Sequence, residues 1–167
     1  MTGIYLAVGS LFLVASAHAA DFQITLDRKK AAPTQTRGGV EQQTSQKWTG
    51  TLRVENTSSK PSPELQAKYI VFVKRQELAQ KAGPDKIDLV KGEAKITPLK
   101  KGEIFSLDTA EIVLRQQLLS ANYQYSNGGQ TKASDTVAGV WVRLFAGTVL
   151  LADYSNPETV KAKFKWE

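Results

Sequence analysis

Apolar and polar residues alternate with a period of two through most of the chain, which is the pattern of strands that bury one face. In the first such run the apolar positions are Phe22, Ile24 and Leu26, and a second run spans residues 48–54. The run at residues 69–73 is apolar on both faces. It predicts a central strand that is covered on both sides.

The second half of the chain continues the alternation in shorter pieces. Residues 87–89 and 94–96 predict two short strands separated by a turn at Lys91-Gly92. Residues 104–107 predict another strand. The clearest hairpin lies in residues 139–153, because both arms are apolar and Ala146-Gly147 connects them.

The C-terminal residues alternate lysines with apolar side chains. Lys161, Lys163 and Lys165 alternate with Ala162, Phe164 and Trp166. Lysines that point outward from an edge strand discourage pairing between chains. The pattern therefore predicts an edge strand here, with its aromatic residues facing the core.

Two segments leave their structure open. Residues 109–121 fit a strand, and they also fit a helix capped by Asp108, with Glu111 at the capping-box position. The β-branched pair Ile112-Val113 favours the strand. Residues 31–45 are rich in Gln, Thr and Gly and predict an irregular edge or a mobile loop.

Together these elements predict an all-β fold, an antiparallel β-sandwich of about 7–9 strands. Residues 20–167 form a single domain in this interpretation, since their number fits one domain. A domain of this size buries enough surface to be stable without disulfides.

Residues 1–19 predict a signal peptide. An apolar run from Ile4 to Ala15 leads into Ala17-His18-Ala19, a small-x-small site that predicts cleavage between Ala19 and Ala20. The run is shorter than the roughly 17–25 residues that span a bilayer. The segment lacks the usual Lys or Arg before the run, and a retained anchor or a buried strand are the alternatives. We expect an exported protein, periplasmic or extracellular in a bacterium, with no transmembrane span after cleavage.

Composition narrows the chemistry. The chain has no Cys, and cleavage after Ala19 removes its one His and its one Met. We therefore expect no catalytic residue, no metal site and no cofactor. The net charge of +6 favours acidic partners, but the cations are scattered, so no specific nucleic acid is expected. The oligomeric state is left open.

Carboxylates are the remaining candidates for catalysis or calcium binding. A glycosidase can work with two carboxylates alone, and Glu93, Glu103, Asp108 and Glu111 are available. Their positions on turns and outward faces favour solvated surface residues. Asp85-Lys-Ile-Asp88 has too few clustered oxygens for a calcium loop.

Aromatic residues beside a glycine-rich turn are the best binding candidates. Tyr123 and Tyr125 alternate into Ser126-Asn127-Gly128-Gly129, and Trp141 lies opposite a buried face. Exposed rings here would stack on sugars, with Asn127 at the tip, whereas aromatic residues in sandwiches also serve as core or cross-strand pairs.

At the level of fold class the chain resembles immunoglobulin-like and fibronectin type III-like sandwiches. The residues that carry this resemblance are Trp48–Asn56, Tyr69–Val73 and the hairpin Gly139–Asp153. The chain is also similar to small exported bacterial proteins that combine a segment like Gly139–Arg143 with a tail like Tyr154–Pro157. The resemblance implies an immunoglobulin-like sandwich and assigns no activity. The antibody-type Cys pair is missing.

Export, the predicted fold and the absence of His and Cys favour a non-enzymatic protein that acts by contact. The first hypothesis is an envelope or secreted protein-interaction module. The alternative is a carbohydrate-binding module that uses Tyr123, Tyr125 and Trp141. The partner is expected to be a protein or a glycan of the cell envelope.

Overall fold

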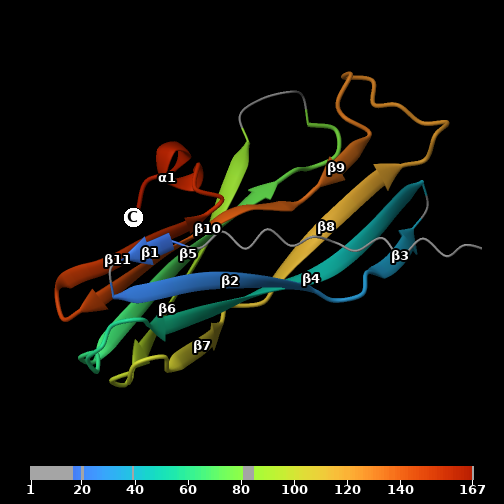
Figure 1. Cartoon of the computed structure of the whole chain (residues 1–167). Coiled ribbons are helices and arrows are strands. Elements are labelled where there is room, and N and C mark those ends of the chain that lie inside the picture. The colour runs from blue at the N-terminus through green and yellow to red at the C-terminus, as the bar shows by residue number, and fades with distance from the viewer. Residues whose placement is uncertain (1–16, 20, 39, 81–84, 167) are drawn as a thin grey trace, which may run out of the picture.

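Two antiparallel sheets pack face to face in the computed structural model, which describes residues 17–19, 21–38, 40–80 and 85–166 (Figure 1). The predicted all-β sandwich is confirmed. The described residues form eleven strands and one short helix, more strands than the expected 7–9. The additional strands are short ones that a period of two does not reveal.

We call the larger sheet sheet A. Its strands, in spatial order, are β1 (Ala17–Ala19), β2 (Phe22–Lys30), β4 (Glu41–Asn56), β8 (Ile112–Leu119) and β9 (Lys132–Ser134), and β3 (Thr34–Gly38) and β7 (Ile104–Asp108) also pair with β4. The first half of β4 pairs with β3 and β8, whereas its second half pairs with β2 and β7. This long strand therefore runs through the whole sheet.

We call the smaller sheet sheet B. Its spatial order is β11 (Val149–Asn156), β10 (Thr136–Ala146), β5 (Leu65–Arg75) and β6 (Lys86–Ile96). The predicted hairpin is confirmed as β10–β11, and the doubly apolar run lies in the central strand β5, as predicted. The chain crosses between the sheets after β4, β6 and β9.

The main core lies between the sheets and is made by the inner face of each strand. From sheet A the fully buried side chains include Ile24, Leu52 and Val54, and from sheet B they include Val71 and Val142. Burial of such aliphatic side chains contributes on the order of 1.5–3 kcal/mol each.

A second apolar cluster covers the outer face of sheet B. The buried side chains of Phe72 and Trp141 face away from the main core and meet the residues that follow the helix α1 (Val160–Lys163). The Phe164 ring stacks on Phe72 at 4.3 Å between centroids, and Trp166 meets Trp141 edge-on at 5.3 Å.

The predicted edge strand at Lys161, Lys163 and Lys165 is therefore wrong. These residues lie in α1 and in the extended segment after it, and this segment pairs with no strand among the described residues. The reason is the apolar outer face of β5 and β10, which has to be shielded from water. The aromatic residues of the C-terminus shield it. They do reach a core, but across the face of sheet B and not from its edge.

Two more expectations change. The turn predicted at Lys91-Gly92 is absent, because β6 continues through it without interruption. Gly92 lies under the ring of Tyr69, and a Cβ at this position would overlap the tyrosine hydroxyl. Gly92 thus makes space for a neighbouring side chain and does not turn the chain.

The polar residues 31–45 are more regular than expected. β3 pairs with the first part of β4 from Thr34 opposite Ser45 to Gly38 opposite Glu41. The strand alternative for residues 109–121 is confirmed by β8.

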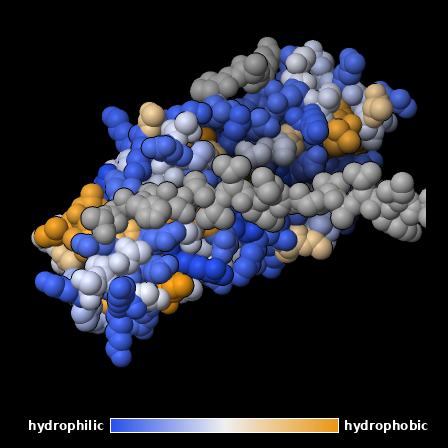
Figure 2. Space-filling model, viewed as in Figure 1, coloured by the Kyte–Doolittle hydropathy of each residue, from blue (hydrophilic) through white to orange (hydrophobic). Residues whose placement is uncertain are grey.

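The surface is largely hydrophilic on the face seen in Figure 2, with hydrophobic residues at the end where β10 turns into β11. Val149 and Leu150 at this turn are 60% and 44% exposed. Within the described residues, no helix is sufficiently long and apolar to cross a membrane.

Candidate binding groove

The predicted tip residues lie in the long connection between β8 and β9. Tyr123 is 52% exposed, whereas Tyr125 is half-buried and donates a 3.4 Å hydrogen bond to the Glu41 carboxylate. Residues 120–131, which include both tyrosines, contain no strand and form two turns joined by irregular segments. Asn127 donates to the carbonyl of Ala79 and accepts from the amide of Gly129. Its amide group therefore joins two loops, one from each sheet.

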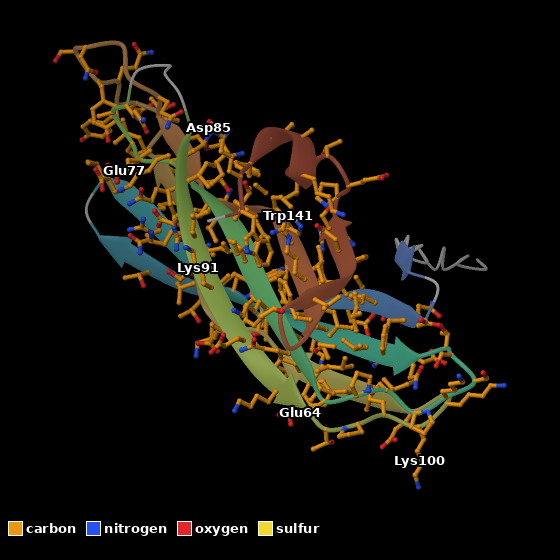
Figure 3. All side chains as sticks on the ribbon, turned by 90° about the vertical axis from the view of Figure 1, so that its left-hand side faces the viewer. Glu64, Glu77, Asp85, Lys91, Lys100 and Trp141 are labelled. Atoms are coloured by element: carbon orange, nitrogen blue, oxygen red, sulfur yellow. The ribbon has the colours of Figure 1, made fainter. Side chains whose placement is uncertain are left out.

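Trp141 does not join these residues. It lies in sheet B on the face that the C-terminal segment covers, and it is 6% exposed (Figure 3). Its indole Nε1 donates a 2.6 Å hydrogen bond to Asp153, and the Arg143 guanidinium lies over both tryptophan rings, at 4.9 Å from the centroid of Trp141 and 4.5 Å from that of Trp166. This ring is not available for stacking on a sugar, so the sugar platform predicted from Tyr123, Tyr125 and Trp141 is not assembled.

Asp153 connects Trp141 to the C-terminal segment through hydrogen bonds and an ion pair. Asp153 accepts hydrogen bonds from Trp141 and Arg143 and forms an ion pair with Lys161 at 2.7 Å. Burial acts to raise the pKa of the Asp153 carboxyl, but the Lys161 and Trp141 hydrogen bonds and the two cations hold this pKa below its ordinary value. The cluster fixes the C-terminal segment to sheet B and is structural.

Each of the candidate carboxylates has a different partner. Asp108 accepts from the Thr51 hydroxyl at 2.6 Å, Glu111 pairs with Lys47, Glu103 accepts from the Lys100 amide, and Glu93 accepts from Gln66. Asp85 and Asp88 pair with different cations, Lys74 and Arg75. Among the described residues there is no group of three His, Cys, Asp or Glu residues that would hold a metal ion.

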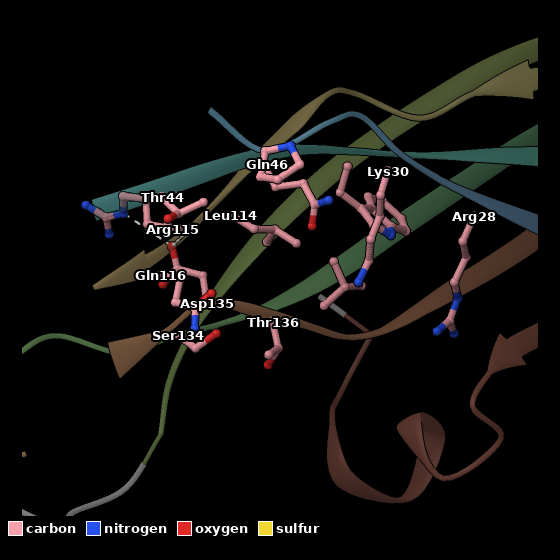
Figure 4. Close-up of a pocket in the computed structure, with 13 residues that line it drawn as sticks. Arg28, Lys30, Thr44, Gln46, Leu114, Arg115, Gln116, Ser134, Asp135 and Thr136 are labelled. Atoms are coloured by element: carbon pink, nitrogen blue, oxygen red, sulfur yellow. Dashed lines mark hydrogen bonds and ion pairs between the residues drawn. The ribbon is translucent and has the colours of Figure 1, made fainter. Parts of the chain in front are cut away.

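The cavity with the most distinctive chemistry lies where the two sheets part. Figure 1 shows β4 and β8 running away from β5 and β6 at this end of the sandwich. The gap is an open groove of about 460 Å³ (Figure 4). This volume is within the range of about 300–1,000 Å³ that is typical of small-molecule sites.

The floor of the groove is the continuation of the inner face of sheet A. The apolar positions 22, 24 and 26 of β2 are followed on the same face by Arg28 and Lys30. In β4 and β8 the same face changes from apolar side chains to Thr44, Gln46 and Gln116. The face thus becomes polar at the point where sheet B no longer covers it.

The opposite wall is the crossover from β9 to β10. Ser134, Asp135 and Thr136 lie on it. Within the described part of the chain, the side chains of Thr44, Gln116 and Thr136 make no hydrogen bond to protein groups. Their hydroxyl and amide groups are therefore open to a ligand.

Asp135 holds this wall between the sheets. Its side chain is fully buried, and Oδ2 accepts from Arg75 Nη1 at 2.8 Å, from the Arg115 amide at 3.0 Å and from Arg115 Nε at 3.2 Å. Oδ1 accepts from the amide of Gln76 at 3.3 Å. Arg75 belongs to sheet B and Arg115 to sheet A, so one carboxylate fastens the two sheets together.

The electrostatics of the groove follow from these contacts. Burial acts to raise the pKa of Asp135, but hydrogen bonds from the Arg115 amide and the Arg75 and Arg115 side chains hold it below its ordinary value. The carboxylate is therefore charged at neutral pH and is matched by its two arginines. Lys30 has no ion-pair partner among the described residues, and Arg28 is hydrogen-bonded only to Asn156. The groove as a whole is basic.

The residues of the predicted cleavage site are only partly described. Ala19 ends the short strand β1, which pairs with the start of β2, and Ala20 lies outside the described residues. Residues 1–16 also lie outside them.

Sequence reasoning missed the groove residues. Arg28 and Lys30 are two of the scattered cations from which the sequence predicts no specific site. The available signal was their spacing, since both continue the even-numbered inward positions of β2.

Comparisons with known proteins do not assign a family. No family profile matches the chain, and no curated protein matches it. Among solved structures, it is similar to a protein from Akkermansia muciniphila, at 12% identity and a TM-score of 0.33, over 93% of this chain and 82% of that one. It is also similar to DesR, a β-glucosidase from Streptomyces venezuelae in complex with D-glucose, at 17% identity and a TM-score of 0.24, over 78% of this chain and 14% of the enzyme. The function therefore has to be inferred from the chain's own groove.

Proposed function

We propose that this protein is an exported, non-enzymatic binding module of the bacterial cell envelope, and that the groove between its sheets is the binding site. The observation that carries the proposal is the change of the inner face of sheet A from apolar to polar and basic where sheet B ends. Within the described residues, the polar side-chain groups of Lys30, Thr44, Gln116 and Thr136 have no protein partner, and all four side chains line this groove.

A non-enzymatic role is supported by the state of the acid in the groove. Asp135 is the carboxylate that lines it, and both of its oxygens are occupied by hydrogen bonds from Arg75, Arg115 and Gln76. A carboxylate with a lowered pKa and a side chain without exposed surface is a poor general base. We assign Asp135 a structural role in the binding wall.

The immunoglobulin-like class is part of the proposal. It is supported by the order β6-β5-β10-β11 in sheet B, with hairpins between β5 and β6 and between β10 and β11. The proposal is also supported by the chain crossing between the sheets after β4, β6 and β9, since Greek-key connections in such sandwiches likewise pass from one sheet to the other.

Export is tested by expressing the chain with its own N-terminus in a bacterium that has an outer membrane. We expect a product that begins at Ala20 in the periplasm or medium, because the site ends in small residues. Ala19→Arg is expected to block processing. A full-length product that stays in the membrane or the cytoplasm would contradict export.

Binding is tested with a glycan array and with envelope extract in parallel, using the exported protein and its Lys30→Glu variant. We expect at least one ligand whose capture is lost in the variant. The variant Tyr123→Ala is the control for the loop aromatics, and we expect it to bind as the wild type does. Capture that depends on Tyr123 and not on Lys30 would move the site away from the groove.

A further inference from the structure

The middle of the groove floor offers side chains and not a strand edge, and this limits its ligands. Thr44 lies in β4 where β3 pairs on one side and β8 on the other, whereas Gln46 pairs with β8 and the carbonyl of the next residue, Lys47, accepts from the Ala31 amide. The backbone of β4 is therefore occupied here, so a peptide cannot add itself as a strand to this part of the floor. Recognition over the middle of the floor has to use side-chain hydroxyl, amide and cationic groups.

The polar groups of the floor suit a ligand that is rich in hydroxyls. Hydroxyl and amide side chains both donate and accept hydrogen bonds, as sugar hydroxyls do. Gln46 uses its amide nitrogen for the carbonyl of Ala31 at 2.9 Å, which fixes the side chain and leaves its oxygen as an acceptor. Thr44, Gln116 and Thr136 offer further hydroxyl and amide groups to the same ligand.

The cations add a requirement for acid groups. Lys30 and Arg28 project from the same face of β2, and Arg115 lines the opposite end of the groove (Figure 4). The Arg115 side chain is 44% exposed, so only part of its guanidinium is used by Asp135. Carboxylates, sulfates or phosphates that are spaced along a chain would meet these cations in turn.

Single-stranded nucleic acid would match the positive charge of the groove, but it also needs exposed aromatic rings, which the groove lining does not provide. Such binding normally combines cations with exposed aromatic rings on which bases stack. The aromatic ring in the groove wall is that of Trp48, which is 1% exposed. The groove has no ring face to offer among its lining residues.

We propose that the ligand of the groove is an anionic polysaccharide, in which ring hydroxyls contact Thr44, Gln46 and Gln116 and the acid groups pair with Lys30 and Arg115. This inference rests on the proposed function, because it names the ligand class of the same site. In this site the sugar is recognised by hydrogen bonds and charge, and not by stacking on exposed aromatic rings such as Tyr123.

The test measures the affinity of the exported protein for four probes by calorimetry. Oligogalacturonate supplies carboxylates and dextran sulfate supplies sulfates, whereas neutral dextran tests hydroxyls alone and polyglutamate tests charge on a peptide. The matched variants are Lys30→Glu in the groove and Lys91→Glu on the exposed face of β6, which change the net charge equally. Thermal unfolding of both variants confirms that they fold.

We expect one or both acidic polysaccharides to bind at least tenfold more tightly than dextran and polyglutamate. Lys30→Glu should weaken this binding about tenfold, the effect of losing one hydrogen bond to a charged group. Lys91→Glu should change it less than twofold, and Gln116→Ala should weaken it several-fold. Added salt should weaken it further.

Other results overturn the inference in distinguishable ways. Equal effects of Lys30→Glu and Lys91→Glu would mean that the probes bind the general positive surface. Polyglutamate binding as tightly as the polysaccharides would mean recognition of charge alone. Failure of all four probes would overturn the ligand class, while a different ligand captured in a Lys30-dependent manner would leave the proposed function standing.

Discussion

The structure predicts that Asp135→Asn strongly destabilises the protein. The carboxylate has no exposed surface and accepts four hydrogen bonds, three of them at Oδ2 from Arg75 and Arg115. An asparagine keeps one acceptor oxygen, and its amide group must face a donor at the other position. Either orientation removes the charge that matches Arg115 and leaves Arg75 with Asp88 alone.

The size of the effect follows from burial. Removing one partner of a buried ion pair costs about 3–5 kcal/mol. Arg75 and Arg115 are 17% and 44% exposed, and Arg75 keeps Asp88, so the lower end applies. We expect a loss of about 3 kcal/mol in the free energy of unfolding. In a chain of this length, a loss of this size lowers Tm by roughly 6–12 °C.

Urea unfolding monitored by tryptophan fluorescence measures this loss, with an unchanged m-value as the sign of an unaltered transition. The control is Asp88→Asn, because Asp88 also pairs with Arg75 but is 43% exposed. Exposed pairs contribute about 0–1 kcal/mol. The reasoning is refuted if both variants lose the same amount, below about 1 kcal/mol.

Asp135 also makes the stability of the protein depend on pH. The pKa of Asp135 is lowered in the folded state, so its contribution is present above the ordinary aspartate pKa of about 3.9 and is lost as pH falls through the folded-state value. The difference in stability between the wild type and Asp135→Asn should therefore shrink on acidification below about pH 4. A difference that stays constant down to about pH 2 would show that the carboxylate charge is not its source.

Two further predictions concern the covered face of sheet B and the Gly92 contact. Trp166→Ala should lower the free energy of unfolding by about 1–2 kcal/mol, since it removes an aromatic pair and a cation–π contact. Urea unfolding measures this loss, and the control is Lys165→Ala, which should leave the stability unchanged. Gly92→Ala should cost about 1–3 kcal/mol by forcing the Tyr69 ring aside; a thermal melt that matches the wild type would contradict the assigned contact.

The periodic patterns predicted the strands of the core well, because the burial of one face is what creates a period of two. Phe22, Ile24 and Leu26 are all buried in β2, and the doubly apolar run of β5 is central. The same rule failed at the C-terminus. There Phe164 and Trp166 pack on the outer face of sheet B, and alternation does not distinguish this arrangement from an edge strand.

The groove was not predictable from residue types alone. Its floor combines side chains from β2, β4 and β8, which are far apart in the sequence, and its wall depends on where β9 crosses to β10. The register of β2 against β4 places Lys30 opposite Trp48, and this pairing is set by the whole sheet. The loop tyrosines were local in sequence and thus easier to notice than the groove.

The central claim is that ligands bind between the sheets, and the most direct test is an NMR titration of the isotope-labelled protein with oligogalacturonate. The account predicts that the largest amide shifts occur at Lys30, Thr44, Gln116 and Thr136, which line the groove. Shifts that gather instead in residues 120–131 or along β6, with the groove amides unchanged, would contradict it.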